Sequence, residues 1–185
     1  MRAEPGQDDG VRAYRREILR PVTRFDLEPA EAPASLDAAY ADIRAEMDRR
    51  PAEWAGWKLG GTNHATKANF GVDEGYFGAI HLSETFMQPV SAPHFALAQL
   101  QGEVEIALRI AADGKGHDAW AVALEMPSSA IRNLPGAGVA ALVADRCAAG
   151  ALLIGPVRHE CLPDLSAARF TLERDGVQLA DAGYE

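Results

Sequence analysis

The chain has 185 residues, of which 48% are hydrophobic and 24% charged, as expected of an ordinary globular domain. Its formal net charge is −9, the opposite sign from a surface built to bind nucleic acid. No apolar run approaches the roughly 20 residues of a membrane helix, and the N-terminus lacks the apolar stretch of a secretory signal. The 2 cysteines build no disulfide framework or zinc cluster. We therefore expect a cytoplasmic protein with no nucleic-acid or membrane partner.

Residues 1–52 are predicted to form a helical N-terminal region. Residues 12–20 place apolar side chains on one face of a possible short helix. A clearer helix follows Ser35, a favourable N-cap, and Pro51 ends it. Its apolar positions recur at helical spacing: Leu36, Ala39, Tyr40, Ile43 and Met47.

Beyond Trp54 the pattern changes to short apolar pieces separated by glycines, which indicates strands and tight loops. Residues 103–110 alternate apolar and polar side chains and predict the clearest strand. A turn around Gly114 leads into a returning strand over residues 119–126.

The last part of the chain continues this mixed pattern. Small apolar residues over 139–149 predict a helix that Gly150 ends, and residues 151–154 predict a buried strand. Residues 170–172 and 177–179 predict a hairpin. Residues 53–185 are thus expected to be mostly β, and the whole chain has an α+β pattern.

Three glutamates are candidates for a metal site. Glu103 and Glu105 lie two residues apart on the predicted strand, so their carboxylates share one face. Two carboxylates on one face repel each other, and Mg²⁺, Mn²⁺ or Ca²⁺ would relieve that repulsion. Glu125 ends an apolar run and could supply a third ligand. The alternatives are a solvated strand face for the pair and an exposed loop rim for Glu125.

Lys58 is a candidate for binding an anionic substrate. It lies in the segment GWKLGGTN, where the glycines allow the backbone to approach a ligand closely. A lysine there could hold a carboxylate or stabilise an enolate. The alternative is an ordinary surface lysine. Cys147 lies in an apolar stretch and is interpreted as a packing residue.

Five blocks, taken in order, resemble the 2-keto-4-pentenoate hydratase group of the fumarylacetoacetate hydrolase superfamily, which also includes 4-oxalocrotonate decarboxylases. The blocks are GWKLGGTN, GVDEGYFGAIH, GEVEIALRI, ALEMPSSAI and VADRCAAGALLIG. The resemblance extends over about residues 36–155 and, more faintly, to residue 176.

The resemblance implies a mixed β-roll and a divalent-metal-dependent hydratase of 2-hydroxy-2,4-dienoates or 2-oxo-alkenoates in aromatic-compound catabolism. It implies Mg²⁺ or Mn²⁺ bound by Glu103, Glu105 and Glu125. It implies that Lys58, with Gly60 and Ser128, binds a small 2-oxo or 2-hydroxy acid. Alternatives within the same resemblance are a decarboxylase, a tautomerase, a C–C hydrolase and a non-catalytic partner subunit.

The chain departs from the family pattern at several places. Gly75 and Tyr76 replace a proline and a second acid that is associated with ordering water or moving protons. Arg146 replaces an asparagine, and residues 114–118 leave no room for the family's crossover helix. The β-roll is incomplete at its C-terminal side relative to the family. We therefore expect a homo-oligomer, or a complex with a longer paralogue.

Overall fold

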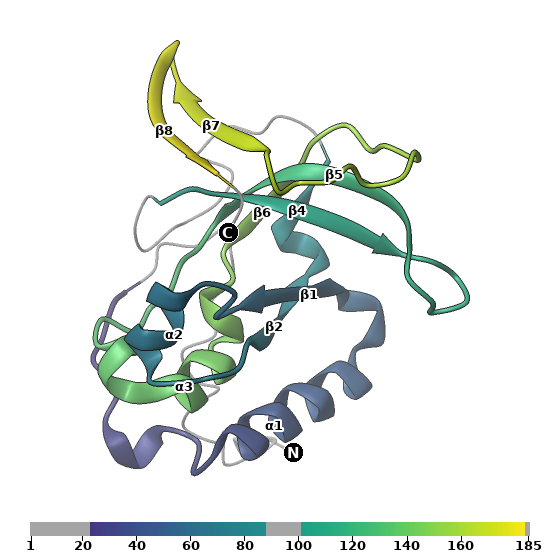
Figure 1. Cartoon of the computed structure of the whole chain (residues 1–185). Coiled ribbons are helices and arrows are strands. Elements are labelled where there is room, and N and C mark those ends of the chain that lie inside the picture. The colour runs from purple at the N-terminus through teal and green to yellow at the C-terminus, as the bar shows by residue number, and fades with distance from the viewer. Residues whose placement is uncertain (1–22, 88–100, 184–185) are drawn as a thin grey trace.

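The structure, a computed structural model, describes residues 23–87 and 101–183. The chain has a mixed α+β architecture, as the sequence predicted (Figure 1). The predicted helix over residues 12–20 lies outside the described residues. None of the described helices is long and apolar enough to cross a membrane. The main elements in chain order are α1 (Leu36–Arg49), β1 (Trp54–Gly60), α2 (His64–Phe70), β2 (Tyr76–His81), β3 (Thr85–Phe86), β4 (Glu103–Ile110), β5 (His117–Met126), α3 (Leu134–Ala144), β6 (Ala151–Ile154), β7 (Arg169–Arg174) and β8 (Val177–Gly183).

Helix α1 forms as predicted and closes one side of the core. The Ser35 hydroxyl accepts a hydrogen bond from the Ala38 N–H at 3.1 Å, which caps the helix. Ala39 and Ile43 are 0% exposed, and the helix packs against α3. Helix α1 therefore shares one hydrophobic core with β2 and α3.

Strands β1 and β2 form an antiparallel two-stranded ribbon, joined by α2. The sequence predicted only strands and loops here, so α2 corrects that prediction. The helix is only seven residues long and depends on local capping rather than apolar periodicity. The Asn63 side chain accepts a hydrogen bond from the Thr66 N–H, and Gly71 ends the helix in the left-handed conformation.

The second sheet has four strands in the order β3-β6-β5-β4. Strand β4 has the predicted bounds, and β5 returns beside it as an antiparallel neighbour. The connection is a tight turn with no crossover helix, as the short spacing indicated. In this register Glu103 lies opposite Glu125, and Glu105 lies opposite Ala123.

The end of α3 differs from the prediction. The helix begins at Leu134 and ends at Ala144, earlier than the expected range of 139–149. A left-handed turn follows, in which Arg146, Cys147 and Ala148 have φ angles of 56°, 57° and 58°. Left-handed backbone costs roughly 1–2 kcal/mol for each residue that carries a Cβ. The small apolar residues of this stretch favour a helix, which is why composition alone predicted one up to residue 149. In the structure, contacts with distant residues hold residues 146–148 in the left-handed turn instead.

Two contacts hold the left-handed turn in place. A Cβ on Gly78 would lie 2.3 Å from the Arg146 carbonyl oxygen, so strand β2 can lie against the turn only with glycine at this position. The Ala148 carbonyl accepts a hydrogen bond from the Ser128 N–H at 2.7 Å.

A buried ion pair provides the third contact. The Arg146 guanidinium donates to both carboxylate oxygens of Glu84, at 2.5 and 2.6 Å, and to the Ala79 carbonyl at 3.3 Å. Both charged side chains are 3% exposed. Since the geometry is bidentate, the pair joins the turn firmly to the segment after β2.

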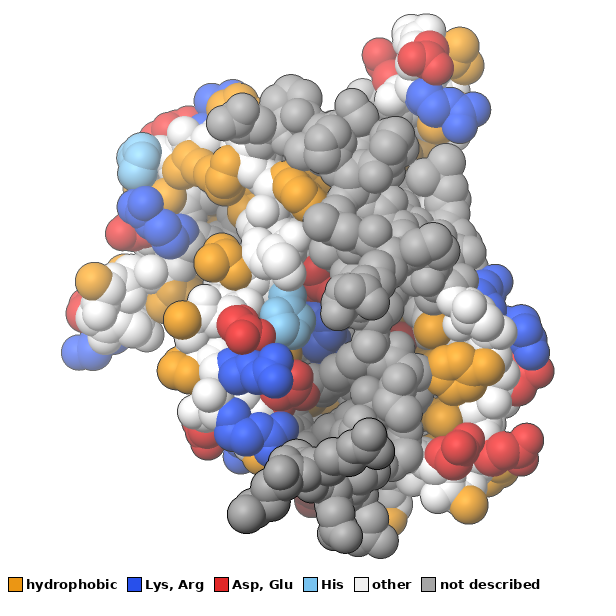
Figure 2. Space-filling model, turned by 180° about the vertical axis from the view of Figure 1, so that it is seen from behind, with side chains coloured by type: hydrophobic (Ala, Val, Ile, Leu, Met, Phe, Trp, Pro, Cys, Tyr) orange, Lys and Arg blue, Asp and Glu red, His pale blue; other side chains and the backbone are white. Residues whose placement is uncertain are grey.

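Strands β7 and β8 form the predicted hairpin, which projects from the four-stranded sheet (Figure 1). Every residue of β8 is exposed. Seen from behind, the hairpin tip stands clear of the body and carries acidic and basic side chains (Figure 2). Within β7, Leu172 lies 3.5 Å from the position that a Cβ on Gly102 would take.

We predict that Arg146→Met lowers the free energy of unfolding by about 3–5 kcal/mol, because it leaves the buried Glu84 carboxylate without its cation. Urea titration measures the change. The matched control is Arg109→Met, which breaks an exposed pair with Asp118 and should change stability little. Similar small losses in both variants would contradict this role of the buried pair.

Candidate metal centre

Three carboxylates converge on one face of the β4–β5 hairpin. Glu103 and Glu105 project from the same face of β4, and Glu125 projects from the end of β5 beside them. One oxygen from each residue lies within 4.8 Å of the other two. Glu125 is 5% exposed, so the alternative of an exposed loop rim is wrong. Glu103 and Glu105 are exposed and mark the open side of the group.

The alternation of the two strands explains this convergence. The apolar positions Val104 and Ile106 fall on the other face of β4 from the glutamates. On β5, the residues that share the face of Glu125 are the small Ala121 and Ala123. Because these neighbours are small, β5 places no large side chain beside the three carboxylates.

Lys58 reaches the same group from the β1–β2 ribbon. Its Nζ contacts Oε1 of Glu125, and the two side chains are 12% and 7% exposed. The alternative of an ordinary surface lysine is therefore wrong. The contact joins the ribbon to the four-stranded sheet across the candidate site.

Burial and mutual repulsion raise the pKa values of two of the carboxyls. The pKa of Glu125 is raised mainly by burial and further by Glu103 and Glu84, against an opposing effect from Lys58. The pKa of Glu105 is raised by partial withdrawal from water and then by its neighbours Glu125 and Glu103. A divalent cation would favour the ionised form of all three carboxyls. The donor set, three carboxylates in reach of one another, suits a hard cation such as Mg²⁺ or Mn²⁺.

Tyr76 fills the space beside Gly60 and Gly61. A Cβ on Gly60 would lie 2.3 Å from the tyrosine ring, and one on Gly61 would lie 2.9 Å from it. The double glycine therefore serves the close approach of Tyr76, whereas a substrate-binding role for Gly60 stays a prediction. Burial raises the pKa of Tyr76 to about 12, with smaller contributions from Cys147 and Glu103. The phenol thus remains neutral at physiological pH.

Two further predicted residues lie in the surrounding core. Ser128 is 1% exposed, and its proposed contact with substrate stays a prediction. Cys147 packs in the main hydrophobic cluster as expected, and burial raises the pKa of its thiol to about 12.

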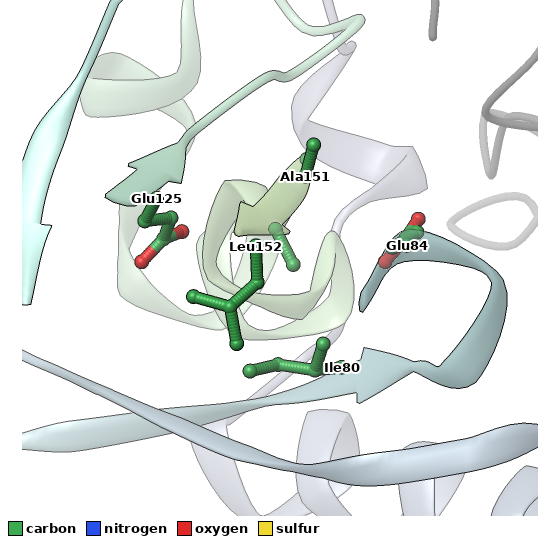
Figure 3. Close-up of a pocket in the computed structure, with 7 residues that line it drawn as sticks. Ile80, Glu84, Glu125, Ala151 and Leu152 are labelled. Atoms are coloured by element: carbon green, nitrogen blue, oxygen red, sulfur yellow. The ribbon is translucent and has the colours of Figure 1, made fainter. Parts of the chain in front are cut away.

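A small pocket behind the carboxylate group reveals a residue that the sequence did not single out. Figure 3 shows Glu125 and Glu84 on either side of Leu152, with Ile80 and Ala151 also lining the pocket. Glu84 lies outside the blocks of the resemblance. The sequence feature that could have indicated a buried acid such as Glu84 was Arg146. An arginine inside an apolar stretch needs a partner of opposite charge if it is buried.

The fold and the site together define a class, namely an α+β protein with three clustered glutamates on a β-hairpin and a lysine in contact with one of them. Among solved structures, the chain is similar to 4-oxalocrotonate decarboxylase from Pseudomonas putida G7 complexed with magnesium and adipate. The TM-score is 0.71 at 20% sequence identity, covering 87% of this chain and 67% of that chain. The same enzyme complexed with calcium and acetate gives a TM-score of 0.66 at 18% identity, covering 87% and 66%.

These similarities confirm the fold that the sequence resemblance implied. The chain spans about two thirds of the length of the decarboxylase structures. No family model matches the sequence, and no curated protein matches it.

We predict that Glu105→Gln weakens Mn²⁺ binding roughly tenfold or more, because it removes one of three anionic ligands while keeping the side-chain shape. Isothermal titration calorimetry measures the affinity. The rise in melting temperature on adding Mn²⁺ should shrink in parallel. Glu173→Gln, on exposed strand β7, is the matched control and should bind Mn²⁺ as the unchanged protein does. Equal Mn²⁺ affinity in the two variants would contradict the prediction, and the carboxylates would then be an ordinary solvated strand face.

The raised pKa values also predict a pH dependence in metal-free protein. Between the ordinary pKa of 4.5 and the raised values, the folded state keeps protons on Glu105 and Glu125 that the unfolded chain has released. The free energy of unfolding should therefore fall as pH rises through this window. Urea titrations across the window should show a shallower fall for Glu105→Gln, which lacks one of these groups. Identical slopes for the two proteins would contradict the prediction.

Proposed function

We propose that the chain is a divalent-metal-dependent lyase that acts on a short 2-oxo acid with a conjugated double bond. The observation that supports this most strongly is the convergence of Glu103, Glu105 and Glu125 beside Lys58. The fold similarity to a decarboxylase complexed with magnesium and adipate supports both the cation and a small carboxylate ligand.

The proposed site assigns a task to each group. Glu103, Glu105 and Glu125 would hold Mg²⁺ or Mn²⁺, which polarises the 2-oxo group of a bound acid as a Lewis acid. Lys58 would bind the adjacent carboxylate of the substrate. Its ammonium is close enough to Glu105 and Glu125 to oppose the rise in the pKa of both carboxyls, so its positive charge lies at the site. Glu103 and Glu105, being exposed, leave the ligand an approach from solvent.

Tyr76 favours decarboxylation over hydration as the reaction. It stands where the resemblance expects an acid, and a phenol, whose pKa is ordinarily 10 and is raised to about 12 here, is neutral at physiological pH where a carboxylic acid would be ionised. A neutral phenol cannot act as the base that activates water. Decarboxylation needs no activated water: the bond to a distal carboxylate breaks, CO₂ leaves, and the electron pair moves through the conjugated chain onto the 2-oxo oxygen. The resulting dienolate then takes a proton.

Product analysis tests this proposal. The protein is incubated with Mg²⁺ and either 2-oxohex-3-enedioate or 2-hydroxypenta-2,4-dienoate, and the products are identified by mass spectrometry. We expect loss of CO₂ from the first compound, no addition of water to the second, and no reaction with a chelator present. Addition of water would instead support the hydratase that the sequence resemblance implied.

The variant Glu105→Gln should reduce the decarboxylation rate strongly, whereas the surface control Glu173→Gln should not. No turnover of either compound by protein that binds Mn²⁺ would contradict the enzymatic proposal. That result would favour a metal-binding partner subunit, which co-purification with a longer paralogue would test.

A further inference from the structure

Lys58 makes a contact that conflicts with the task proposed for it. Its ammonium touches Oε1 of Glu125, and both side chains are largely buried. An ammonium held on this carboxylate is not free to bind the carboxylate of a substrate. The following inference rests on the proposed function and concerns how the two tasks are reconciled.

The charges of the site indicate what would release the lysine. Three ionised carboxylates and one ammonium leave two formal negative charges, which one divalent cation neutralises. A cation bound among the carboxylate oxygens, which lie within 4.8 Å of one another, would come close to an ammonium in contact with one of them. Two cations at such a distance repel each other, and burial weakens the screening by water.

We propose that Lys58 is a counter-ion that the metal displaces. Without metal, the ammonium occupies Glu125 and offsets part of the repulsion among the three carboxylates. When the divalent cation binds, Lys58 leaves Glu125 and turns toward the open side of the site, where Glu103 and Glu105 are exposed. There it meets the carboxylate of the incoming acid. The site therefore binds metal first and the 2-oxo acid second.

The side chain of lysine suits this exchange. Its four-carbon stem has several rotatable bonds and ends in a compact charge, so the ammonium can move while β1 stays in place. Oxygens of the bound acid would replace the oxygen of Glu125 as its partner, so the buried charge is paired before and after the exchange.

Chemical labelling can follow the position of Lys58 without any catalysis. The chain has three lysines, Lys58, Lys67 and Lys115, so each can be followed separately by peptide mass spectrometry after brief acetylation. We expect Lys58 to be protected in metal-free protein and several-fold more reactive with saturating Mg²⁺. Adding oxalate as a substrate-like acid should protect it again. Lys67 and Lys115 serve as internal controls and should react equally in all three conditions.

Calorimetry of a Lys58 variant gives an independent readout. Lys58→Met removes the competing charge, so Mn²⁺ should bind roughly tenfold more tightly. Oxalate should then bind to the Mn²⁺-loaded variant at least roughly tenfold more weakly than to the unchanged protein. Lys58→Arg keeps the charge and should keep the Mn²⁺ affinity close to the original. Lys115→Met, which removes an exposed charge, should change neither affinity.

The outcomes separate this inference from the proposed function. If Mn²⁺ does not bind the unchanged protein, both are overturned. If Mn²⁺ binds but leaves the acetylation of Lys58 unchanged, only the displacement is overturned. Weaker Mn²⁺ binding by Lys58→Met would also overturn it, because that result makes Lys58 a support for Glu125 rather than a competitor of the metal.

Discussion

The register of the β4–β5 hairpin is the constraint on which the candidate site depends. It sets Glu103 opposite Glu125 and keeps Glu105 on the same face. Because side chains alternate along a strand, a slip of one residue would turn the carboxylates of the shifted strand to the other face. The same register keeps the half-buried Val104 and Ile106 on the face of β4 opposite the acids, so the alternation of the strand and the clustering of the acids require one alignment. The fold and the chemistry of this chain are therefore specified by one pattern.

The sequence was informative wherever a local pattern determined the structure. The alternation over residues 103–110 and the N-cap at Ser35 were enough to predict a strand and a helix in their observed positions. Apolar periodicity was insufficient at α2, whose two turns depend on the Asn63 cap and on Gly71, and local pattern was insufficient after Ala144, where the backbone becomes left-handed. Contacts with distant residues hold that turn, so no window of sequence around it could have predicted its conformation.

The candidate site could be assembled from sequence in part. The three glutamates were proposed together from the resemblance, and the structure brings their oxygens to one place. The contact of Lys58 with Glu125 joins residues 67 positions apart, and spacing alone carries no information about it. The pair of Arg146 and Glu84, 62 positions apart, was missed for the same reason. In both cases the high free-energy cost of burying an unpaired charge predicts that a partner of opposite charge exists. It does not predict which residue that partner is.

The left-handed turn at residues 146–148 has a consequence for how this sequence can vary. Its conformation is unfavourable for each of its residues, so it persists only while its surroundings compensate. Those surroundings come from distant parts of the chain. Gly78 and Gly150 leave room because glycine carries no Cβ, and a Cβ on Gly150 would lie 2.0 Å from the Met126 carbonyl oxygen. Glu84 supplies the negative charge that pairs with Arg146. Substitutions at these positions should therefore be strongly epistatic. A homologue without the left-handed turn could have other residues at all three positions. A homologue with the turn should have glycine, glutamate and glycine there together.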